Sequence, residues 1–404
     1  MAAPKRKIIN DPVYGFITIN HPLIFSILAH PYYQRLRRIT QMAMGQLVYP
    51  GAVHTRFHHS LGAYHLMGNA VNELRSKGTE ITEEEEIAVK AAILLHDIGH
   101  GPYSHALEHV VVKGVHHEAL SLQIMHEMNA AFDGQLTLAI EIFTGAYHKP
   151  FLHQLISGQL DMDRMDYLSR DSFFCGVSEG VIGYDRILKM LVVVDGQLMI
   201  EEKGIYSVEK FLVARRQMYW QVYLHKTVLS AEKMMVKILE RARSLYTSTD
   251  PAMQTQSALD YFLGAFTGVM DSFGLAQFCA LDDHDIMHAI KRWSTHPDKV
   301  LSLLCSRFLS RQLYKTTIQS EPFLPATIAA KQKESLDASE LDPSQVGYVC
   351  FTGEATNTLY QTKDERINIL FKDGSIKDIS LIDNALIHQN LSAAIKKNYI
   401  CQLL

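Results

Sequence analysis

The sequence predicts a mostly α-helical protein with small β accessories, on the basis of three observations. Long segments carry apolar residues in a helical pattern, most clearly over residues 56–76, 83–96 and 207–244. Short runs rich in β-branched residues lie beside turn signals, as at 7–20 and 192–201. Of the 404 residues, 47% are hydrophobic, which is ample for a large buried core.

The composition also excludes several classes of protein. A net charge of −4 gives no overall basic field, so we expect neither nucleic acid nor an acidic membrane surface as a partner. The five cysteines are scattered without a CxxC pair, which favours a reduced, cytoplasmic chain. No apolar run is long enough to span a bilayer. The N-terminal Met-Ala-Ala-Pro-Lys-Arg-Lys is not followed by the apolar region of a signal peptide.

The N-terminal elements follow from turn and capping signals. Residues 7–20 predict a β-hairpin around an Asp-Pro/Tyr-Gly turn, and a helix is expected over 22–29. Residues 31–43 carry three arginines on a helical pattern, which form either a solvated basic face or a functional one. Glycine and proline predict a loop over 45–57 before the helix at 56–76.

The helix that ends at His96-Asp97 is the centre of the sequence. Thr82 is a good N-cap, so the acidic residues after it are interpreted as capping and solvation rather than as a metal site. The apolar run stops abruptly at His96-Asp97, and Gly99 breaks the helix. Burying an imidazole and a carboxylate without a partner is costly, and a divalent metal satisfies both groups at once.

The remaining elements are mostly helices. We expect helices at 117–128, 136–145, 151–175, 181–194, 207–244, 256–273, 282–314 and 384–397. We expect hairpin turns at Asp195-Gly196 and Asp373-Gly374, strands within 346–382 and a linker at 320–345. These elements suggest a catalytic core with an N-terminal hairpin over 1–245, a helical extension over 246–320 and an α+β appendage over 321–404.

Residue types that bind metals are concentrated around the central helix. Eleven of the twenty histidines lie between His54 and His126. His59, His96-Asp97 and an aspartate of the segment 161–167 come from separate predicted helices or helix ends. Two imidazoles and two carboxylates form a mixed site that suits Mn, Fe, Mg, Zn or Ni, with positions left for water and substrate. Spacing alone leaves the choice between Asp161 and Asp163 open.

A second His-Asp sequence serves as an internal comparison. Asp283-His284-Asp285 has no glycine-rich break after it and no acidic helix to follow. We therefore interpret it as a solvated helix start rather than as a metal site.

The motifs as a set resemble those of the HD-domain phosphohydrolases, most closely the deoxynucleoside triphosphate triphosphohydrolase branch. They are Arg56-Phe-x-His59-Ser-Leu-Gly, His96-Asp97-x-Gly-His100-Gly-Pro-x-Ser-His105, His117-Glu118 and Asp161-x-Asp163-Arg-x-Asp-Tyr167-x-x-Arg-Asp171. The resemblance implies an HD-domain helical core and a divalent metal held by His59, His96, Asp97 and Asp163. It also implies that metal-activated water attacks the α-phosphorus of a deoxynucleoside triphosphate, releasing deoxynucleoside and inorganic triphosphate.

The resemblance implies roles for further residues. His105 is the general acid that protonates the leaving 5′-oxygen, Glu108 orients it and His117 assists at the phosphate. His100 faces the phosphates or a second metal. The implied substrate-binding residues are Arg56, Arg164 and Arg215 for the phosphates, Gln41, Asp171 and Tyr223 for the sugar, and Tyr167 and Tyr219 beside them.

Some positions depart from the family pattern. Tyr219 stands where a histidine is usual, and Met42 is larger than the usual residue at the sugar edge. Gln34 and Arg37 match an allosteric nucleotide site, but Ala29 replaces the aspartate that reads guanine. We therefore expect no GTP requirement, and any nucleotide effector to bind differently. The family also implies a homo-oligomer, either a dimer or a tetramer.

Two other functions remain open. The first is hydrolysis of another nucleotide phosphoester, such as a monophosphate, a cyclic nucleotide or a signalling nucleotide. A second metal bound by His100, His105 and His117 would favour it. The other is a nucleotide-binding regulatory protein with vestigial catalysis, against which the intact set of ligands and acids argues.

Overall fold

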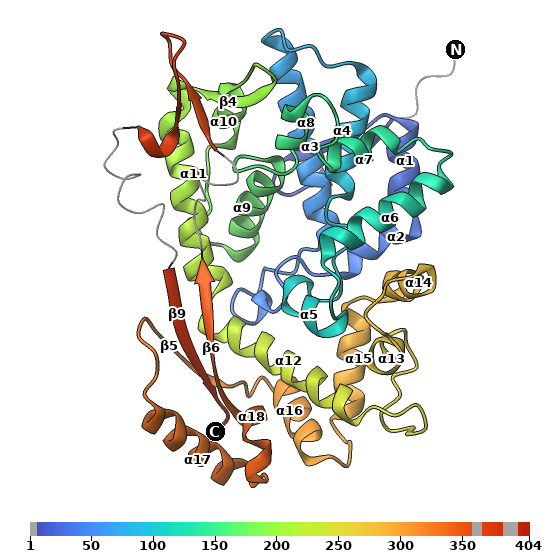
Figure 1. The fold of residues 1–404 in the computed structure, drawn as a ribbon, viewed down its shortest axis with the longest axis vertical. Coiled ribbons are helices and arrows are strands. Elements are labelled where there is room, and N and C mark those ends of the chain that lie inside the picture. Colours follow the sequence, from blue (N-terminus) through green and yellow to red (C-terminus); the bar gives the residue numbers. More distant parts are fainter. Residues whose placement is uncertain (1–5, 358–365, 383–394) are drawn as a thin grey trace.

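Two adjacent helices, α3 (Arg56–Ser76) and α4 (Glu83–Leu95), lie side by side in the upper half of the molecule in Figure 1. They belong to a computed structural model that describes residues 6–357, 366–382 and 395–404. Helix α4 begins as predicted, because Thr82 and Glu85 form a reciprocal capping box. Helix α3 packs on α4 and on α9 (Met162–Cys175), so the segments that carry the metal-ligand residue types meet in the core.

The other helices precede or follow α9 in the chain. Those before α9 are α1 (Pro22–Ala29), α2 (Pro31–Gln34), α5 (Glu108–Val111), α6 (His117–Ala131), α7 (Thr137–Phe143) and α8 (Pro150–Gln154). Those after α9 are α10 (Tyr184–Met190), α11 (Ile205–Met218), α12 (Lys226–Leu245), α13 (Leu259–Gly264), α14 (Ser272–Ala280), α15 (Asp283–Trp293), α16 (Lys299–Leu309), α17 (Pro325–Ser339) and α18 (Val346–Val349). The predicted fold class, mostly helical with small sheets, is confirmed.

Small sheets lie at the periphery of the helical core. The N-terminal hairpin pairs β1 (Lys7–Asp11) with β2 (Gly15–Ile19). A second sheet has the order β3-β4-β7-β8 and a third the order β5-β9-β6. Their strands are β3 (Leu191–Val194), β4 (Gln197–Glu201), β5 (Lys315–Gln319), β6 (Cys350–Asn357), β7 (Asn368–Leu370), β8 (Ile376–Asp378) and β9 (Ile395–Gln402). Both predicted hairpin turns are present, and among the described helices none is long and apolar enough to cross a membrane.

Two long predicted helices are interrupted, and both predictions were wrong in the same way. The segment 151–175 breaks after α8, because Asp161 caps a new helix by accepting a hydrogen bond from the Arg164 amide. The segment 207–244 widens into a π-helix over Tyr219–Tyr223 (η5), and His225 then caps α12. π-Helical turns are often found at functional sites, and this one lies on the wall of the pocket described below.

The arginines at 35–38 form a solvated basic face only in part, because Arg37 and Arg38 are exposed and Arg35 is not. Arg35 is completely buried, donates hydrogen bonds to the carbonyls of Ile98 and Leu281, and lies over the Phe278 ring. A buried guanidinium needs such acceptors. The two carbonyls and the ring that contact it come from distant parts of the chain. Helical periodicity could not reveal them.

The C-terminal predictions fail for tertiary reasons. Residues 320–345 are not a linker, because Pro325 opens α17, which packs on β6 and β9. The segments 256–273 and 282–314 are each helical only in part. Of the helix predicted at 384–397, residues 395–397 belong to β9, where they pair with β6, and 383–394 lie outside the described residues.

The internal comparison at Asp283 also needs correction. The segment does start a helix, and the His284 side chain is exposed. Asp283, however, is buried and accepts hydrogen bonds from the Thr40 amide and hydroxyl and from the Tyr103 amide. It is therefore an anchor for the loop that follows His96-Asp97, and not part of a solvated helix start.

Candidate active site

Four side chains from three helical segments meet at the centre of the core. The Nε2 atoms of His59 and His96 are 3.4 Å apart, and Asp163 Oδ1 lies 3.1 Å and 3.5 Å from them. The Asp97 carboxylate is 3.5 Å from His59 Nε2 and 3.4 Å from His96 Nε2. The structure thus brings together the four residues expected to hold a metal.

The other ring nitrogen of each histidine is already engaged. His59 Nδ1 donates to Asp166 at 2.7 Å, and His96 Nδ1 donates to the Ile93 carbonyl at 2.6 Å. These bonds leave both Nε2 lone pairs directed toward the two carboxylates. Metal-ligating histidines are oriented by such hydrogen bonds in proteins, so this donor set fits a divalent metal ion.

The charges of this cluster are mutually stabilised. Burial alone would lower the pKa of His59, but its hydrogen bonds to Asp163 and Asp166 raise it to about 10. Burial would raise the pKa of Asp97, but Arg56 and the neighbouring histidines hold it well below its usual range. The carboxylates are therefore ionised and retain a cation, which is a proton on His59 when no metal is bound.

Sequence reasoning missed the residues that support His59. Asp166 accepts a hydrogen bond from His59 Nδ1 and forms an ion pair with Arg170. Arg170 in turn donates a hydrogen bond to Asp11 at 2.8 Å. All of these side chains are buried. Asp166 and Arg170 are four residues apart on α9, and this spacing was a signal for their ion pair. No local pattern indicated Asp11.

Gly62 is required where α3 passes this buried network. A Cβ atom at Gly62 would lie 1.9 Å from Asp166 Oδ1 and 2.2 Å from an Arg170 nitrogen. Glycine is unfavourable inside a helix, so its presence at this position is explained by the close approach of α9.

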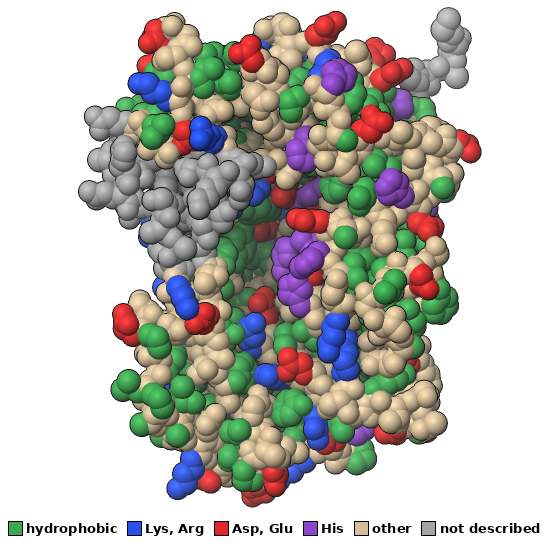
Figure 2. All heavy atoms as spheres, in the orientation of Figure 1, with side chains coloured by type: hydrophobic (Ala, Val, Ile, Leu, Met, Phe, Trp, Pro, Cys, Tyr) green, Lys and Arg blue, Asp and Glu red, His purple; other side chains and the backbone are tan. Residues whose placement is uncertain are grey.

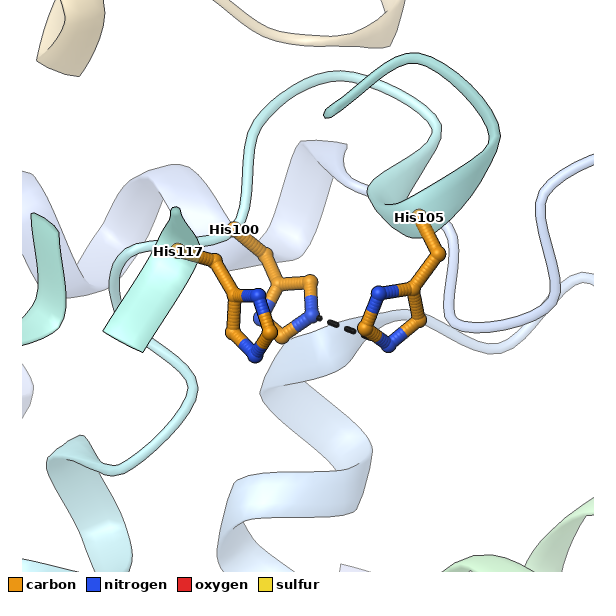
Figure 3. A group of neighbouring side chains, drawn as sticks. All are labelled: His100, His105 and His117. Carbon is orange, nitrogen blue, oxygen red and sulfur yellow. Dashed lines mark hydrogen bonds between the residues drawn. The ribbon is translucent and has the colours of Figure 1, made fainter. Parts of the chain in front are cut away.

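A second cluster contains three histidines, His100, His105 and His117 (Figure 3). His100 Nε2 lies 3.3 Å from His105 Nε2, and the His100 and His117 rings are 4.1 Å apart. His100 Nδ1 lies 3.3 Å from Asp97, so His100 stands between the two clusters. Burial lowers the pKa of His100 well below its usual value, and the nearby Arg56 adds to this effect.

Glu108 joins the other two histidines. Its carboxylate accepts from His105 Nδ1 at 3.1 Å, from His117 Nδ1 at 2.7 Å and from the His117 amide at 2.9 Å. Burial would raise the pKa of Glu108, but these hydrogen bonds lower it far more. One carboxylate thus fixes the orientation of both rings, and the His105 side chain remains 65% exposed on the open side.

The loop between the two clusters has a strained backbone. Tyr103 and Ser104 have φ angles of 54° and 52°, which is unusual for residues with a side chain. The Tyr103 amide donates to Asp283 at 2.7 Å, and Arg56 Nε donates to the Ser104 hydroxyl at 2.9 Å. These bonds hold the loop and place His105 beside the cavity.

Both clusters contribute to one cavity of about 600 Å³, the first through Asp97 and Asp163 and the second through its three histidines. Figure 2 shows histidine and acidic side chains gathered along a hollow in this face of the molecule. Residues expected at the site that line the cavity are Gln41, Arg56, Asp97, His100, His105, His117, Asp163, Tyr167, Asp171, Arg215, Tyr219 and Tyr223. Arg164 is not among the cavity-lining residues, and its guanidinium pairs with Asp161 at 2.7 Å.

The expected sugar contacts are partly engaged with one another. Asp171 accepts from His54 and from the Tyr223 hydroxyl, each at 2.7 Å. The side-chain oxygen of Gln41 is buried and has no hydrogen-bond partner among the described residues. A buried acceptor without a donor is costly, so Gln41 is ready to accept a hydrogen bond from a ligand in the cavity.

Two family models match the chain. The HD domain model matches residues 56–171, and the model for the HD associated region matches residues 182–261. The first range begins at α3 and ends at Asp171 on α9, and so contains both clusters.

Similar proteins cover most of the chain. An uncharacterized protein of Bacillus subtilis, YwfO, is 32% identical over 93% of this chain and 87% of its own length. The crystal structure of a phosphohydrolase from Bacteroides thetaiotaomicron has a TM-score of 0.91 and 48% identity, covering 98% of this chain and all of that one. The deoxynucleoside triphosphate triphosphohydrolase SAMHD1 homolog of Dictyostelium discoideum is 31% identical over 60% of this chain and 51% of its own length.

Proposed function

We propose a reaction for this chain, which belongs to the metal-dependent HD-domain phosphohydrolases that carry an HD-associated region. It hydrolyses deoxynucleoside triphosphates to deoxynucleoside and inorganic triphosphate. One observation carries the proposal. A single cavity is lined by the two aspartates of the His-Asp cluster, the histidines of the second cluster, two arginines and the expected sugar residues Gln41 and Tyr223. The similarity to triphosphohydrolases supports the choice of substrate.

In this proposal His59, His96, Asp97 and Asp163 hold the metal. When bound, a divalent ion would lower the pKa of a water molecule and polarise the phosphoryl group. Arg56 and Arg215 line the same cavity and bind the triphosphate, because guanidinium groups make charge-assisted contacts to phosphate oxygens. Arg164, paired with Asp161 on the first turn of α9, would contact the phosphates only after that pair opens.

His105 supplies the proton that the leaving group needs. Water adds to the α-phosphorus and loses one proton to solvent, the bond to the 5′-oxygen breaks, and the His105 proton passes to that oxygen. Solvent then protonates His105 again. Glu108 holds the His105 ring from its Nδ1 side, which leaves Nε2 to donate. His117, held by the same carboxylate, and His100, which stands between the clusters, contact the phosphates.

The deoxyribose lies between Gln41 and Tyr223. The unpartnered Gln41 oxygen accepts from the 3′-hydroxyl. The Tyr223 ring, fixed by its hydrogen bond to Asp171 and by an edge contact with Tyr167, packs on the sugar and leaves no room for a 2′-hydroxyl. Tyr219 lines the same wall and donates to the Thr356 carbonyl, so its hydroxyl is engaged.

The decisive experiment is incubation with each dNTP and rNTP in Mn²⁺ or Mg²⁺, followed by identification of the products. We expect deoxynucleoside and inorganic triphosphate from dNTPs and little product from rNTPs. The double variant His96→Ala, Asp97→Ala should lose this activity and keep its helical circular dichroism spectrum. Release of monophosphate or diphosphate from the wild-type protein would refute the proposal.

The same assay tests whether hydrolysis requires GTP as an effector. Because Ala29 offers no carboxylate to a guanine, we propose that turnover does not depend on GTP. Equal rates with and without GTP are expected. Hydrolysis that begins only when GTP is added would contradict this.

One observation favours a second candidate function. The nitrogens of His100, His105 and His117 can approach within 4.8 Å of one another, which is compatible with a second metal ion. A dinuclear site would favour another nucleotide phosphoester as substrate. Metal analysis distinguishes the candidates, since one ion per chain fits the triphosphohydrolase and two ions fit the alternative.

A further inference from the structure

An unpaired carboxyl group faces the cavity from α12. Glu232 lines the cavity and is half-buried, and within the described ranges no side chain pairs with it. The other acidic residues of the lining differ, because Asp97 pairs with Arg56, Asp163 with His59, and Asp171 with Tyr223. A carboxyl group that faces a cavity without a partner points to a ligand that supplies the donors.

The position of Glu232 on the cavity wall follows that of the residues expected at the sugar. Val228 and Glu232 are one helical turn apart and line the cavity from the same face of α12. The cavity-lining cations are Arg56 on α3, Arg215 on α11 and Lys233, which is next to Glu232. In the proposed function the phosphates lie at the metal residues of α3 and α9 and Tyr223 packs on the sugar. Because Leu224, Val228 and Glu232 continue the lining beyond Tyr223, the part of the ligand beside Glu232 is the base.

The surroundings of Glu232 suit a planar ring. Met42, Ala43, Leu224 and Val228 give the cavity apolar lining. Burial raises the pKa of the Glu232 carboxyl to about 7, so an N–H donor from the ligand would stabilise its ionised form.

We propose that Glu232 reads the base of the nucleotide and selects guanine. The inference rests on the proposed function, because it assumes a nucleotide in this cavity. Guanine presents two neighbouring donors, N1–H and the 2-amino group, which match the two oxygens of a carboxylate. Adenine and cytosine offer one amino group beside an acceptor, and thymine offers one N–H between two carbonyls. The preferred substrate is then dGTP.

Equilibrium binding tests the inference without turnover. The full chain carrying His105→Gln, with and without Glu232→Gln, is titrated with dGTP, dITP and dATP at about pH 8, where a carboxyl with a pKa near 7 is ionised. With Glu232 present, dGTP should bind ~5–150-fold more tightly than dATP, the range expected of one bidentate contact. The analogue dITP, which lacks the 2-amino group, should lie between them.

The isosteric Glu232→Gln change should reduce the ratio of the dGTP affinity to the dATP affinity to below about twofold, since only one acceptor remains at the side chain. The matched control is Glu240→Gln on the same helix, where Glu240 is exposed and pairs with Lys237 at 2.9 Å. This control should keep the ratio. Thermal melting of each variant establishes that it is folded.

The outcomes separate this inference from the proposed function. A ratio near one in the presence of Glu232, or a ratio that survives Glu232→Gln, overturns base reading even where triphosphate is released. A guanine preference that disappears in Glu232→Gln supports base reading even where the wild-type products refute a triphosphohydrolase. Failure of every dNTP to bind overturns both.

Discussion

At the scale of single residues, His105 and Glu108 of the second cluster differ in exposure and in hydrogen bonding. His105 is largely exposed to the cavity, while Glu108 is mostly buried and holds both His105 and His117. One carboxylate therefore sets the position of the acid and of its neighbour. The two residues should consequently respond differently to substitution.

Replacing His105 by Gln removes the proton donor. We expect kcat for dNTP hydrolysis to fall by ~10²–10⁴. With a dNTP analogue that has sulfur in place of the bridging 5′-oxygen, His105→Gln should lower kcat by less than about tenfold, because a thiolate with a pKa near 8.5 leaves without a proton. His109→Gln, an exposed histidine on α5, is the control and should behave as wild type. Equal losses on both substrates would show that His105 is not the acid.

Glu108 predicts a pH dependence of stability. Its hydrogen bonds lower its pKa below the unfolded value of about 4.3, so it stabilises the fold above that pH and loses this effect as the pH falls toward the folded pKa. Glu108→Gln should therefore reduce the free energy of unfolding by about 1–2 kcal/mol near neutral pH. Urea denaturation at several pH values should find the difference shrinking below about pH 4. A difference independent of pH would contradict this origin.

At the scale of elements, two aspartates at the start of α9 have different surroundings. Asp161 precedes the helix and accepts from the amides of Gly158 and Arg164, whereas Asp163 turns toward His59 and His96. Spacing left both residues open as ligands, and the capping geometry now distinguishes them.

This difference predicts opposite phenotypes for two substitutions two residues apart. Asp163→Ala should abolish tight metal binding, measured by calorimetry on the metal-free protein, with little change in fold. Asp161→Ala should retain the metal and lower stability by about 0.5–2 kcal/mol, the usual cost of losing an N-cap. Loss of metal in Asp161→Ala at unchanged stability would reverse the assignment.

At the scale of the whole molecule, the site depends on segments far outside the family motifs. The N-terminal hairpin reaches the first cluster through Asp11, Arg170 and Asp166. The helix α15 reaches the second through Asp283 and the Tyr103 amide. The active centre is therefore supported by segments that precede and follow residues 56–171 in the sequence.

The hairpin link can be tested by Asp11→Asn. Asparagine can still accept from the Val13 and Tyr14 amides, so the turn is kept while the charge that faces Arg170 is removed. We expect metal affinity to fall by ~10-fold, the lower end of the effect of a supporting residue. Asp185→Asn, an exposed aspartate at the start of α10, is the control. Unchanged metal affinity in Asp11→Asn would show that the hairpin does not support the site.

Local signals predicted much of this fold, and the failures share a physical cause. The N-cap at Thr82, the hairpin turns and helix α3 depend on residues near one another in sequence, and these predictions are confirmed. The burial of Arg35 and the packing of α17 depend on partners far along the chain. The roles of the metal, acid and sugar residues, and the boundaries of the three predicted units, stay predictions.

The strained Tyr103–Ser104 loop has a consequence for how this protein could lose activity. Because the loop is pinned by Asp283, a change confined to α15 would displace His105 while the His59–Asp166–Arg170 network stayed intact. Under the proposed function, such a chain would still bind metal and nucleotide without hydrolysing the nucleotide. A single mutational step, far from every recognisable motif, therefore separates an enzyme of this architecture from a nucleotide sensor.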